Sequence, residues 1–250
     1  MISRVCLVIL NFIFYIGIFL FSIVIIIVGV ILFSLAFLIF SKRTILRRFR
    51  RTISWYGKIV VYVLPFPFVK IVYKDFWKKK ETGPFIFICN HRSAVDPFLF
   101  AFLPYECIQV VNIWPFKLPF FGFFAKRAGY LSVKELSHED FSKEVSKLLE
   151  EGVNIISFPE GTRATHKKLG QFYSSIFRVA YETQCSIVPV CFTGNEKVMA
   201  KGTSILRPGV IKIHKLPPLH WNDYKDLTPF TLKKKVRGII EKETVRMDAL

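Results

Sequence analysis

Residues 5–40 form an uninterrupted stretch without a charged side chain, and this stretch limits the possible folds more than any other feature. As a single α-helix, the stretch would be roughly 54 Å long at 1.5 Å per residue. The hydrocarbon core of a bilayer is only about 30 Å thick, so one straight perpendicular span leaves part of the stretch unused. The sequence therefore predicts a membrane-embedded segment in one of two forms. A span continues into an interfacial helix, or two short helices form a hairpin.

A cleaved signal peptide is the competing interpretation of this segment, because Ser34-Leu35-Ala36 resembles a small-residue cleavage site. The apolar part of a signal peptide, however, is only about 7–15 residues long. The stretch is much longer than that. We therefore expect residues 1–41 to be a retained membrane anchor.

A dense basic cluster directly follows the apolar stretch and consists of Lys42, Arg43, Arg47, Arg48, Arg50 and Arg51. By the positive-inside rule, such a flank predicts that the cluster and all of the chain that follows it lie on the cytoplasmic side of the membrane. Basic residues near the surface also attract anionic lipids, by about 1 kcal/mol each. A nucleic-acid-binding patch is the alternative interpretation. The adjacent membrane segment argues against it, so no nucleic-acid partner is expected.

The net charge of +18 is concentrated towards the amino terminus, because ten basic residues precede the first acidic residue, Asp75. The stretch from Trp55 to Tyr73 is apolar and rich in aromatic residues, and Pro65 and Pro67 interrupt it. Aromatic side chains of this kind favour the headgroup level of a membrane. We expect residues 42–82 to form a basic juxtamembrane segment consisting of an interfacial helix, a turn and an edge strand.

Short apolar runs alternate with amphipathic segments from Gly83 onward. Runs at 85–89, 153–158 and 187–192 are typical of strands buried on both faces, and further strands are expected at 107–113, 129–133 and 210–214. Helices are expected between Ser137 and Gly152 and at 172–183 and 231–245. The alternation predicts an α/β domain over residues 83–250, with a mixed, mostly parallel sheet flanked by helices.

Two polar residues, His91 and Asp96, follow the first of these strands. Ligands of open α/β sheets bind beyond the carboxyl ends of strands, so His91 lies at the productive end. A separation of five residues cannot bring two side chains together along a strand. It can if Ser93 caps a helix whose first turn holds Asp96. The carboxylate then fixes the tautomer of the imidazole and leaves the other ring nitrogen as a general base.

A second polar segment, Pro159-Glu160-Gly161-Thr162-Arg163, follows another predicted strand. Glycine permits close backbone approach, and the guanidinium group of arginine suits a phosphate. The composition of this segment indicates an anion-binding loop.

Together, these segments resemble a known family. Asn90-His91-x4-Asp96-Pro97 and Phe158-Pro159-Glu160-Gly161-Thr162-Arg163 are similar to the first and third motif blocks of the lysophosphatidate acyltransferases, which belong to the glycerolipid acyltransferases. Ile187-Val188-Pro189-Val190 resembles the fourth block. The resemblance implies transfer of a fatty acyl group from a thioester donor, acyl-CoA or acyl carrier protein, to the free hydroxyl of a lysoglycerophospholipid. The leading acceptor is lysophosphatidate, which would yield phosphatidate.

The resemblance also implies roles for individual residues. His91 acts as the general base and Asp96 orients it. The substrate-binding residues are Glu160, Gly161, Thr162, Arg163, Asn90 and Lys134. Of these, the loop from Glu160 to Arg163 is expected to hold the phosphate of the acceptor.

This sequence departs from the family pattern at two places. Glu135 stands where the second block has a basic residue, and Tyr173-Ser174 replaces a lysine-containing segment after the third block. Two kinds of alternative therefore remain. The acceptor could be another lysolipid or glycerol 3-phosphate, or the reaction could be acyl exchange between phospholipids. A non-enzymatic binder of anionic lipid or nucleic acid is a further alternative, and the His91 and Asp96 pair argues against it.

No cofactor or metal is expected from the remaining residues. The five cysteines form no C-x-x-C pair, and the four other histidines lack metal-ligand spacing. The sequence contains no glycine-rich P-loop and no dinucleotide-binding fingerprint. We therefore expect reduced thiols and a reaction that uses side chains alone.

Overall fold

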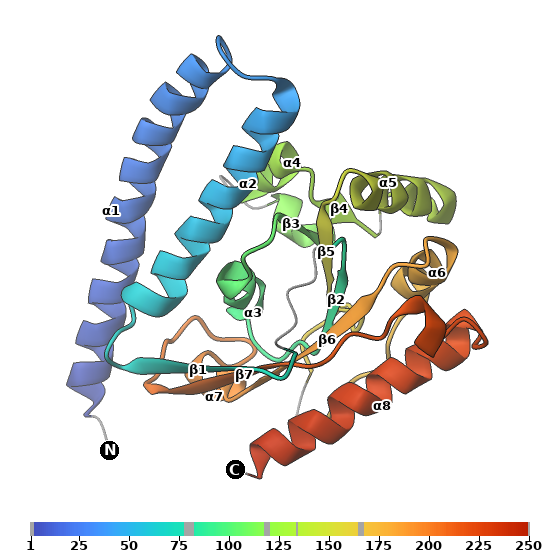
Figure 1. Cartoon of the computed structure of the whole chain (residues 1–250). Coiled ribbons are helices and arrows are strands. Elements are labelled where there is room, and N and C mark those ends of the chain that lie inside the picture. The colour runs from blue at the N-terminus through green and yellow to red at the C-terminus, as the bar shows by residue number, and fades with distance from the viewer. Residues whose placement is uncertain (1–2, 78–82, 118–120, 134, 165–167, 250) are drawn as a thin grey trace.

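The computed structural model describes residues 3–77, 83–117, 121–133, 135–164 and 168–249 (Figure 1). The α-helices are α1 (Arg4–Ala36), α2 (Lys42–Lys58), α3 (Asp96–Leu99), α4 (Phe121–Ala128), α5 (His138–Glu150), α6 (Ser175–Glu182), α7 (Asn195–Val198) and α8 (Pro229–Asp248). The shorter helical turns are η1 (Ile59–Val63), η2 (Phe100–Phe102), η3 (Trp114–Lys117) and η4 (Trp221–Asp223). The strands are β1 (Val69–Asp75), β2 (Ile86–Cys89), β3 (Cys107–Val111), β4 (Leu131–Ser132), β5 (Asn154–Ser157), β6 (Ile187–Thr193) and β7 (Gly209–Lys215).

The strands form one sheet in the order β1-β7-β6-β2-β5-β3-β4. All neighbouring strands are parallel, except that β6 and β7 are antiparallel. The predicted mixed, mostly parallel sheet is therefore confirmed, and each strand expected beyond Gly83 overlaps one of β2 to β7. Because β2 lies between β6 and β5 and is parallel to both, the loops that follow these three strands meet at one edge of the sheet.

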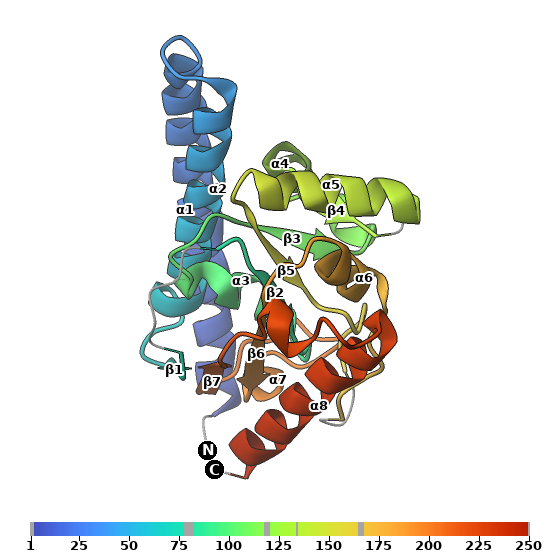
Figure 2. The ribbon, with the colours of Figure 1, turned by 45° about the vertical axis from the view of Figure 1, so that its right-hand side comes forward.

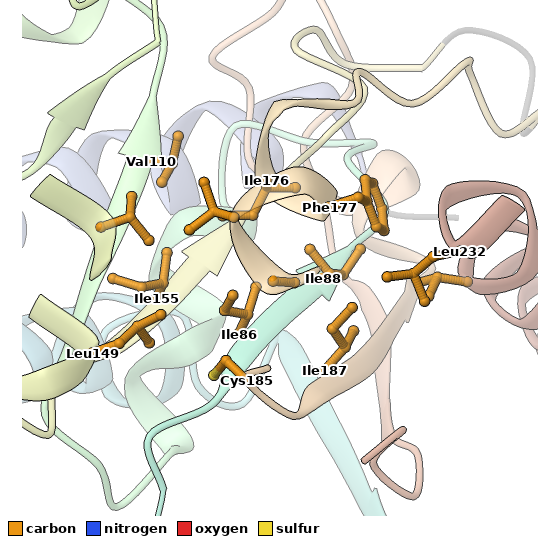
Figure 3. Packing of buried hydrophobic residues seen from close by; sticks show 14 of the residues in the cluster. Ile86, Ile88, Val110, Leu149, Ile155, Ile176, Phe177, Cys185, Ile187 and Leu232 are labelled. Carbon is orange, nitrogen blue, oxygen red and sulfur yellow. The ribbon is translucent and has the colours of Figure 1, made fainter. Parts of the chain in front are cut away.

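Helices cover both faces of the sheet, because the central strands are apolar on both sides. Ile86 and Ile88 of β2 pack into a core under α5, α6 and α8, which Figure 3 shows from close by. Phe87 and Cys89 point to the opposite face and pack with residues of α1, η1 and α3. This alternation produces a three-layer arrangement, as expected for strands buried on both sides.

The apolar amino-terminal stretch is one continuous helix. α1 runs through Gly17 and Gly29 without a break, so of the two forms left open for residues 5–40 the structure has the long helix rather than the hairpin. Instead, α2 turns back and lies beside α1 in both views (Figures 1 and 2). Contacts between the helices include Phe21 stacked on Tyr56, with ring centroids 5.5 Å apart. Within the described residues, α1 is the helix long and apolar enough to cross a membrane, and it indicates membrane association.

A buried acidic residue attaches the basic helix α2 to the sheet. Glu106, immediately before β3, has a side chain only 6% exposed. Its carboxylate accepts hydrogen bonds from Arg43 at 2.6 Å and from Arg50 at 2.8 Å. Burial raises the pKa of Glu106, but the bonds from the two arginines outweigh it, and the net pKa lies below the ordinary value. Arg43 and Arg50 of the basic cluster therefore hold α2 on the sheet.

From α2 onward, the elements follow one another in the order expected for residues 42–82, which was a helix, a turn and an edge strand. α2 and η1 are followed by a turn and then by β1, which is an edge strand of the sheet and pairs with β7. β1 thus belongs to the same sheet as the strands beyond Gly83. The sheet therefore extends across the boundary that the sequence placed between residues 82 and 83.

Candidate active site

His91 and Asp96 are in direct contact beyond the end of β2. Nδ1 of His91 lies 2.8 Å from Oδ2 of Asp96. Asp96 is completely buried, whereas the imidazole of His91 remains 18% exposed. The expected return of the carboxylate onto the imidazole is therefore present. With Nδ1 bonded to Asp96, the ring nitrogen left to meet a substrate is Nε2.

The turn between the two residues differs from the one expected. Asp96 begins α3, but Ser93 does not cap that helix. The Ser93 hydroxyl instead donates to the carbonyl oxygen of Met199 at 2.7 Å. The backbone N–H groups of Arg92 and Ser93 both donate to Oδ2 of Asp96, at 2.7 and 2.8 Å. Asp96 therefore holds the loop as well as the imidazole.

Asn195, which the sequence did not single out, completes the environment of Asp96. It is fully buried at the start of α7, and its side-chain amide donates to Oδ1 of Asp96. Both carboxylate oxygens thus have separate partners. The one signal in the sequence was position, since Asn195 follows a predicted buried strand at the edge of the sheet where ligands bind.

Glu160 holds the second loop against the first. One carboxylate oxygen accepts from the backbone N–H of His91 at 2.7 Å, and the other accepts from the N–H of Gly170 at 2.8 Å. The backbone N–H of Ala164 donates to the carbonyl oxygen of His91 at 2.7 Å. Burial raises the pKa of Glu160 even though both accepted bonds favour its charged form. Glu160 is therefore an internal brace, with its carboxylate turned into the protein.

The remainder of this loop is presented to solvent. Gly161 has a φ of +66°, a left-handed conformation that favours glycine. A Cβ there would lie 2.8 Å from the ring of the exposed Tyr173, which would have to move aside. Gly161 and Thr162 are exposed and Arg163 is half-buried. The ammonium group of Lys201 reaches the same loop and donates to the carbonyl oxygen of Arg163 at 2.7 Å.

The two other expected substrate-binding residues lie elsewhere. Asn90 is fully buried, and its amide exchanges hydrogen bonds with the backbone of Phe192, at 2.9 Å as donor and 2.8 Å as acceptor. It attaches the end of β2 to β6. Lys134 lies outside the described residues.

Apolar groups lie beside the His91 and Asp96 pair. The ring of Phe158 packs on the imidazole of His91, with centroids 4.6 Å apart. Beside the loop is an apolar cavity of about 220 Å³. Its lining includes Ala94, Val95 and Phe98 near the dyad and Phe14 and Ile18 of α1. The site therefore combines a partly exposed imidazole, an exposed polar loop and an apolar cavity.

Comparison with known proteins places this arrangement in a family. The family model described as Acyltransferase matches residues 70–193. Two relatives are the chloroplastic 1-acyl-sn-glycerol-3-phosphate acyltransferase of Arabidopsis thaliana, 28% identical over 62% of this chain and 45% of its own length, and the enzyme of that name from Limnanthes douglasii, 27% identical over 67% of this chain and 60% of its own length. The chain belongs to the acyltransferase family.

The fold of this acyltransferase family member also has a solved counterpart. The crystal structure of the 1-acyl-sn-glycerophosphate acyltransferase PlsC from Thermotoga maritima superposes with a TM-score of 0.81 and 20% identity, covering 99% of this chain and 98% of that one. This likeness shows a shared fold. The chain spans about half the length of the curated relatives named above.

The family match contains both motif loops of this acyltransferase but ends at residue 193. Asn195 and Lys201, which contact those loops in the structure, lie beyond it. The comparison therefore accounts for the His91 and Asp96 pair and the Glu160–Arg163 loop as parts of the matched segment. The contribution of α7 and the residues after it follows from the tertiary structure alone.

Proposed function

We propose that the protein is a membrane-bound O-acyltransferase that transfers a fatty acyl group from a thioester donor to the free hydroxyl of lysophosphatidate, forming phosphatidate. The observation that carries the proposal is the 2.8 Å contact between His91 and the fully buried Asp96. The two relatives named above are 1-acyl-sn-glycerol-3-phosphate acyltransferases, which supports the same reaction.

In this reaction, Nε2 of His91 removes the proton from the acceptor hydroxyl as its oxygen attacks the thioester carbonyl. Asp96 keeps the proton of the neutral imidazole on Nδ1 and stabilises the imidazolium that forms. The tetrahedral intermediate then collapses, the carbon–sulfur bond breaks, and the imidazolium returns the proton to the leaving thiolate. The products are an oxygen ester and a free thiol, so no acyl-enzyme and no cofactor are needed.

The acceptor phosphate binds at the exposed part of the loop from Gly161 to Arg163. Thr162 and Arg163 supply donors, and Gly161 gives the loop its left-handed turn. Lys201, already bonded to the carbonyl oxygen of Arg163, contributes a second cation beside it. Glu160 and Asn90 act from inside by holding the loops, and Lys134 remains a predicted contact.

The donor is a thioester of coenzyme A or of acyl carrier protein. Both carry negative charge, which suits a chain of net charge +18. The apolar cavity of about 220 Å³ beside Ala94 and Val95 offers a place for the acyl chain near the reacting carbonyl. Its lining by residues of α1 would bring a chain from the membrane towards the base.

The membrane topology follows from α1 and the residues after it. α1 embeds in the bilayer with most of its apolar side chains exposed to lipid. The basic residues of α2 that are not used by Glu106 contact anionic headgroups. By the positive-inside rule, the catalytic domain then lies on the cytoplasmic side.

A panel assay tests the reaction. Purified protein in detergent is supplied with acyl-CoA or acyl carrier protein thioesters and with lysophosphatidate, other lysophospholipids or glycerol 3-phosphate, and products are identified by mass. We expect phosphatidate from lysophosphatidate in a thioester-dependent reaction. A strong preference for another acceptor, or acyl exchange without thioester, would select one of the alternative acyltransferase reactions. No product from any pair would contradict the proposal.

A further inference from the structure

The four residues at the start of the dyad loop are each fixed by a different part of the fold. Asn90 is bonded to the backbone of Phe192 in β6. His91 is held through its backbone by Glu160 and Ala164 of the second loop. The Ser93 hydroxyl is bonded to Met199 after α7. The remaining member, Arg92, reaches a fourth element, the carboxyl-terminal helix α8.

Arg92 is a buried cation within this loop, with a side chain 5% exposed. Its Nη1 donates to both carboxylate oxygens of Asp248 in the last turn of α8, at 2.9 and 3.1 Å. Glu196 of α7 lies 3.9 Å from the same nitrogen. Among the residues that the structure describes, neither buried carboxylate oxygen of Glu196 has a hydrogen-bond partner. Two acids therefore surround one guanidinium group, and Asp248 makes the direct bonds.

The ion pair with Asp248 argues against a role for Arg92 in binding the acceptor phosphate. A cation one residue from His91 is a natural candidate for binding a phosphate. However, its guanidinium group is buried and engaged by Asp248. A buried ion pair of this kind is costly to open, because opening leaves an uncompensated charge in the interior. Arg92 therefore acts within the protein.

The backbone of Arg92 connects this ion pair to the dyad. Its N–H donates to Oδ2 of Asp96 at 2.7 Å, on the same oxygen that contacts His91. The side chain of Arg92 is tied to α8 and its backbone to Asp96, so the position of α8 fixes one of the donors that orient the carboxylate. α8, red in Figures 1 and 2, itself packs on the sheet through Leu232, Val236 and Ile240.

We propose that Asp248 is a positioning residue for the active site, which acts through Arg92 to hold the loop that orients Asp96 and His91. The inference rests on the proposed acyl transfer for its kinetic consequence. Small displacements of reacting groups reduce rates steeply, by as much as 100-fold for about 1 Å. Loss of the Asp248 carboxylate should therefore reduce turnover without weakening acceptor binding, because Arg92 does not contact the acceptor.

The test compares Asp248→Asn with the parent and with Arg246→Gln, a matched control in the same turn of α8. Arg246 is exposed and pairs with Glu243 on its own helix. For Asp248→Asn we expect kcat to fall about tenfold or more, with the acceptor KM within about twofold, at a temperature where melting curves show folded protein. Arg246→Gln should match the parent in both constants. Asp248→Glu, which keeps the carboxylate, should recover most of the loss.

A second variant and a second measurement separate positioning from general stability. The double variant Arg92→Met/Asp248→Asn removes both partners, and its kcat should be no lower than that of Arg92→Met alone. Hydrogen exchange of the Arg92 and Ser93 amides, which donate to Asp96, should accelerate in Asp248→Asn and not in Arg246→Gln. Exchange needs no substrate, so it decides the positioning role even if the panel assay defeats the proposed reaction.

Several results would overturn the inference. Unchanged exchange at Arg92 and Ser93 would show that Asp248 does not hold the loop. Parental kcat in folded Asp248→Asn would show that the ion pair does not serve the dyad. A raised acceptor KM at parental kcat would place Arg92 in the acceptor site instead. If Asp248→Asn does not fold, the double variant is compared with Arg92→Met alone, and a kcat of the double variant well below that of Arg92→Met would count against the inference.

Discussion

The side-chain amide of Asn195 donates a hydrogen bond to Oδ1 of Asp96, a residue 99 positions earlier in the chain. The other oxygen, Oδ2, receives His91 and two backbone N–H groups. Because both oxygens are occupied, the carboxylate has one orientation, and so has the imidazole that it holds. α7 is thereby coupled to the proposed catalytic dyad of His91 and Asp96.

Replacement of Asn195 should therefore impair catalysis through Asp96. Hydrogen bonds to charged groups contribute about 1.5–3 kcal/mol, so we expect Asn195→Ala to lower kcat about tenfold or more with little change in KM. Asn195→Asp should be worse, since it places a second negative charge against Asp96. Steady-state kinetics check this, with the exposed Asn222→Ala as the matched control. Parental kcat in a folded Asn195→Ala protein would remove Asn195 from the site.

Loss of the proposed base, His91, should lower kcat more than loss of Asn195 does. His91→Ala leaves no imidazole to accept the hydroxyl proton, and base catalysis contributes about 10²–10⁴-fold. We expect kcat to fall by that range while circular dichroism and melting remain close to the parent. His138→Ala, which removes an exposed histidine at the start of α5, should leave the rate unchanged. A His91→Ala protein that turns over within about tenfold of the parent would mean that another group is the base.

Lys201 should distinguish acceptors by their phosphate. Lys201→Gln removes the ammonium group beside Arg163, and loss of a charge-assisted hydrogen bond should raise KM for lysophosphatidate about tenfold. A monoacylglycerol has the same hydroxyl chemistry without the phosphate, so its acylation should not change. The exposed Lys197→Gln is the control on the neighbouring helix α7. Equal effects on both acceptors would show that Lys201 does not bind the phosphate.

The ion pairs of Glu106 with Arg43 and Arg50 should make a pH-dependent contribution to the free energy of unfolding. The folded-state pKa of Glu106 lies below its ordinary value of 4.5, so the folded protein keeps the carboxylate charged where the unfolded chain protonates it. This stabilisation is present above pH 4.5 and is lost as the pH falls through the folded-state pKa. Glu106→Gln leaves the buried Arg50 without its carboxylate, and we expect about 3 kcal/mol less free energy of unfolding at pH 7.

Urea denaturation in detergent, followed by tryptophan fluorescence, measures this difference. The gap between parent and Glu106→Gln should narrow below pH 4.5. Glu151→Gln is the control, because Glu151 also faces Arg43 but at 3.8 Å and with a much more exposed side chain. Its cost should stay below about 1 kcal/mol. A constant gap between pH 7 and pH 3 would show that the charge of Glu106 is not what stabilises α2.

The sequence predicted the sheet well because buried strands and amphipathic helices have different hydrophobic periods. Runs such as 85–89 and 187–192 are apolar on both faces, and the structure places them at the centre. The sequence did not decide between one long helix and a hairpin for residues 5–40, because a long run of apolar residues does not encode where the chain turns. In the structure the chain turns only after α1, and α2 then packs along it. The expected cap at Ser93 was wrong, since its hydroxyl is used by Met199.

By itself, the sequence determined the long apolar stretch, the α/β domain and the two motif loops, because periodicity, charge and residue spacing are local properties. Only the tertiary structure decided what holds those loops. Asn195, Lys201 and Asp248 reach them from positions distant in the chain, and Glu160 and Asn90 are turned inward to other backbone groups. A polar side chain looks the same in a sequence whether it contacts a ligand or a neighbouring loop. The folded sheet, which brings the ends of β2, β5 and β6 together, fixes which partner it meets.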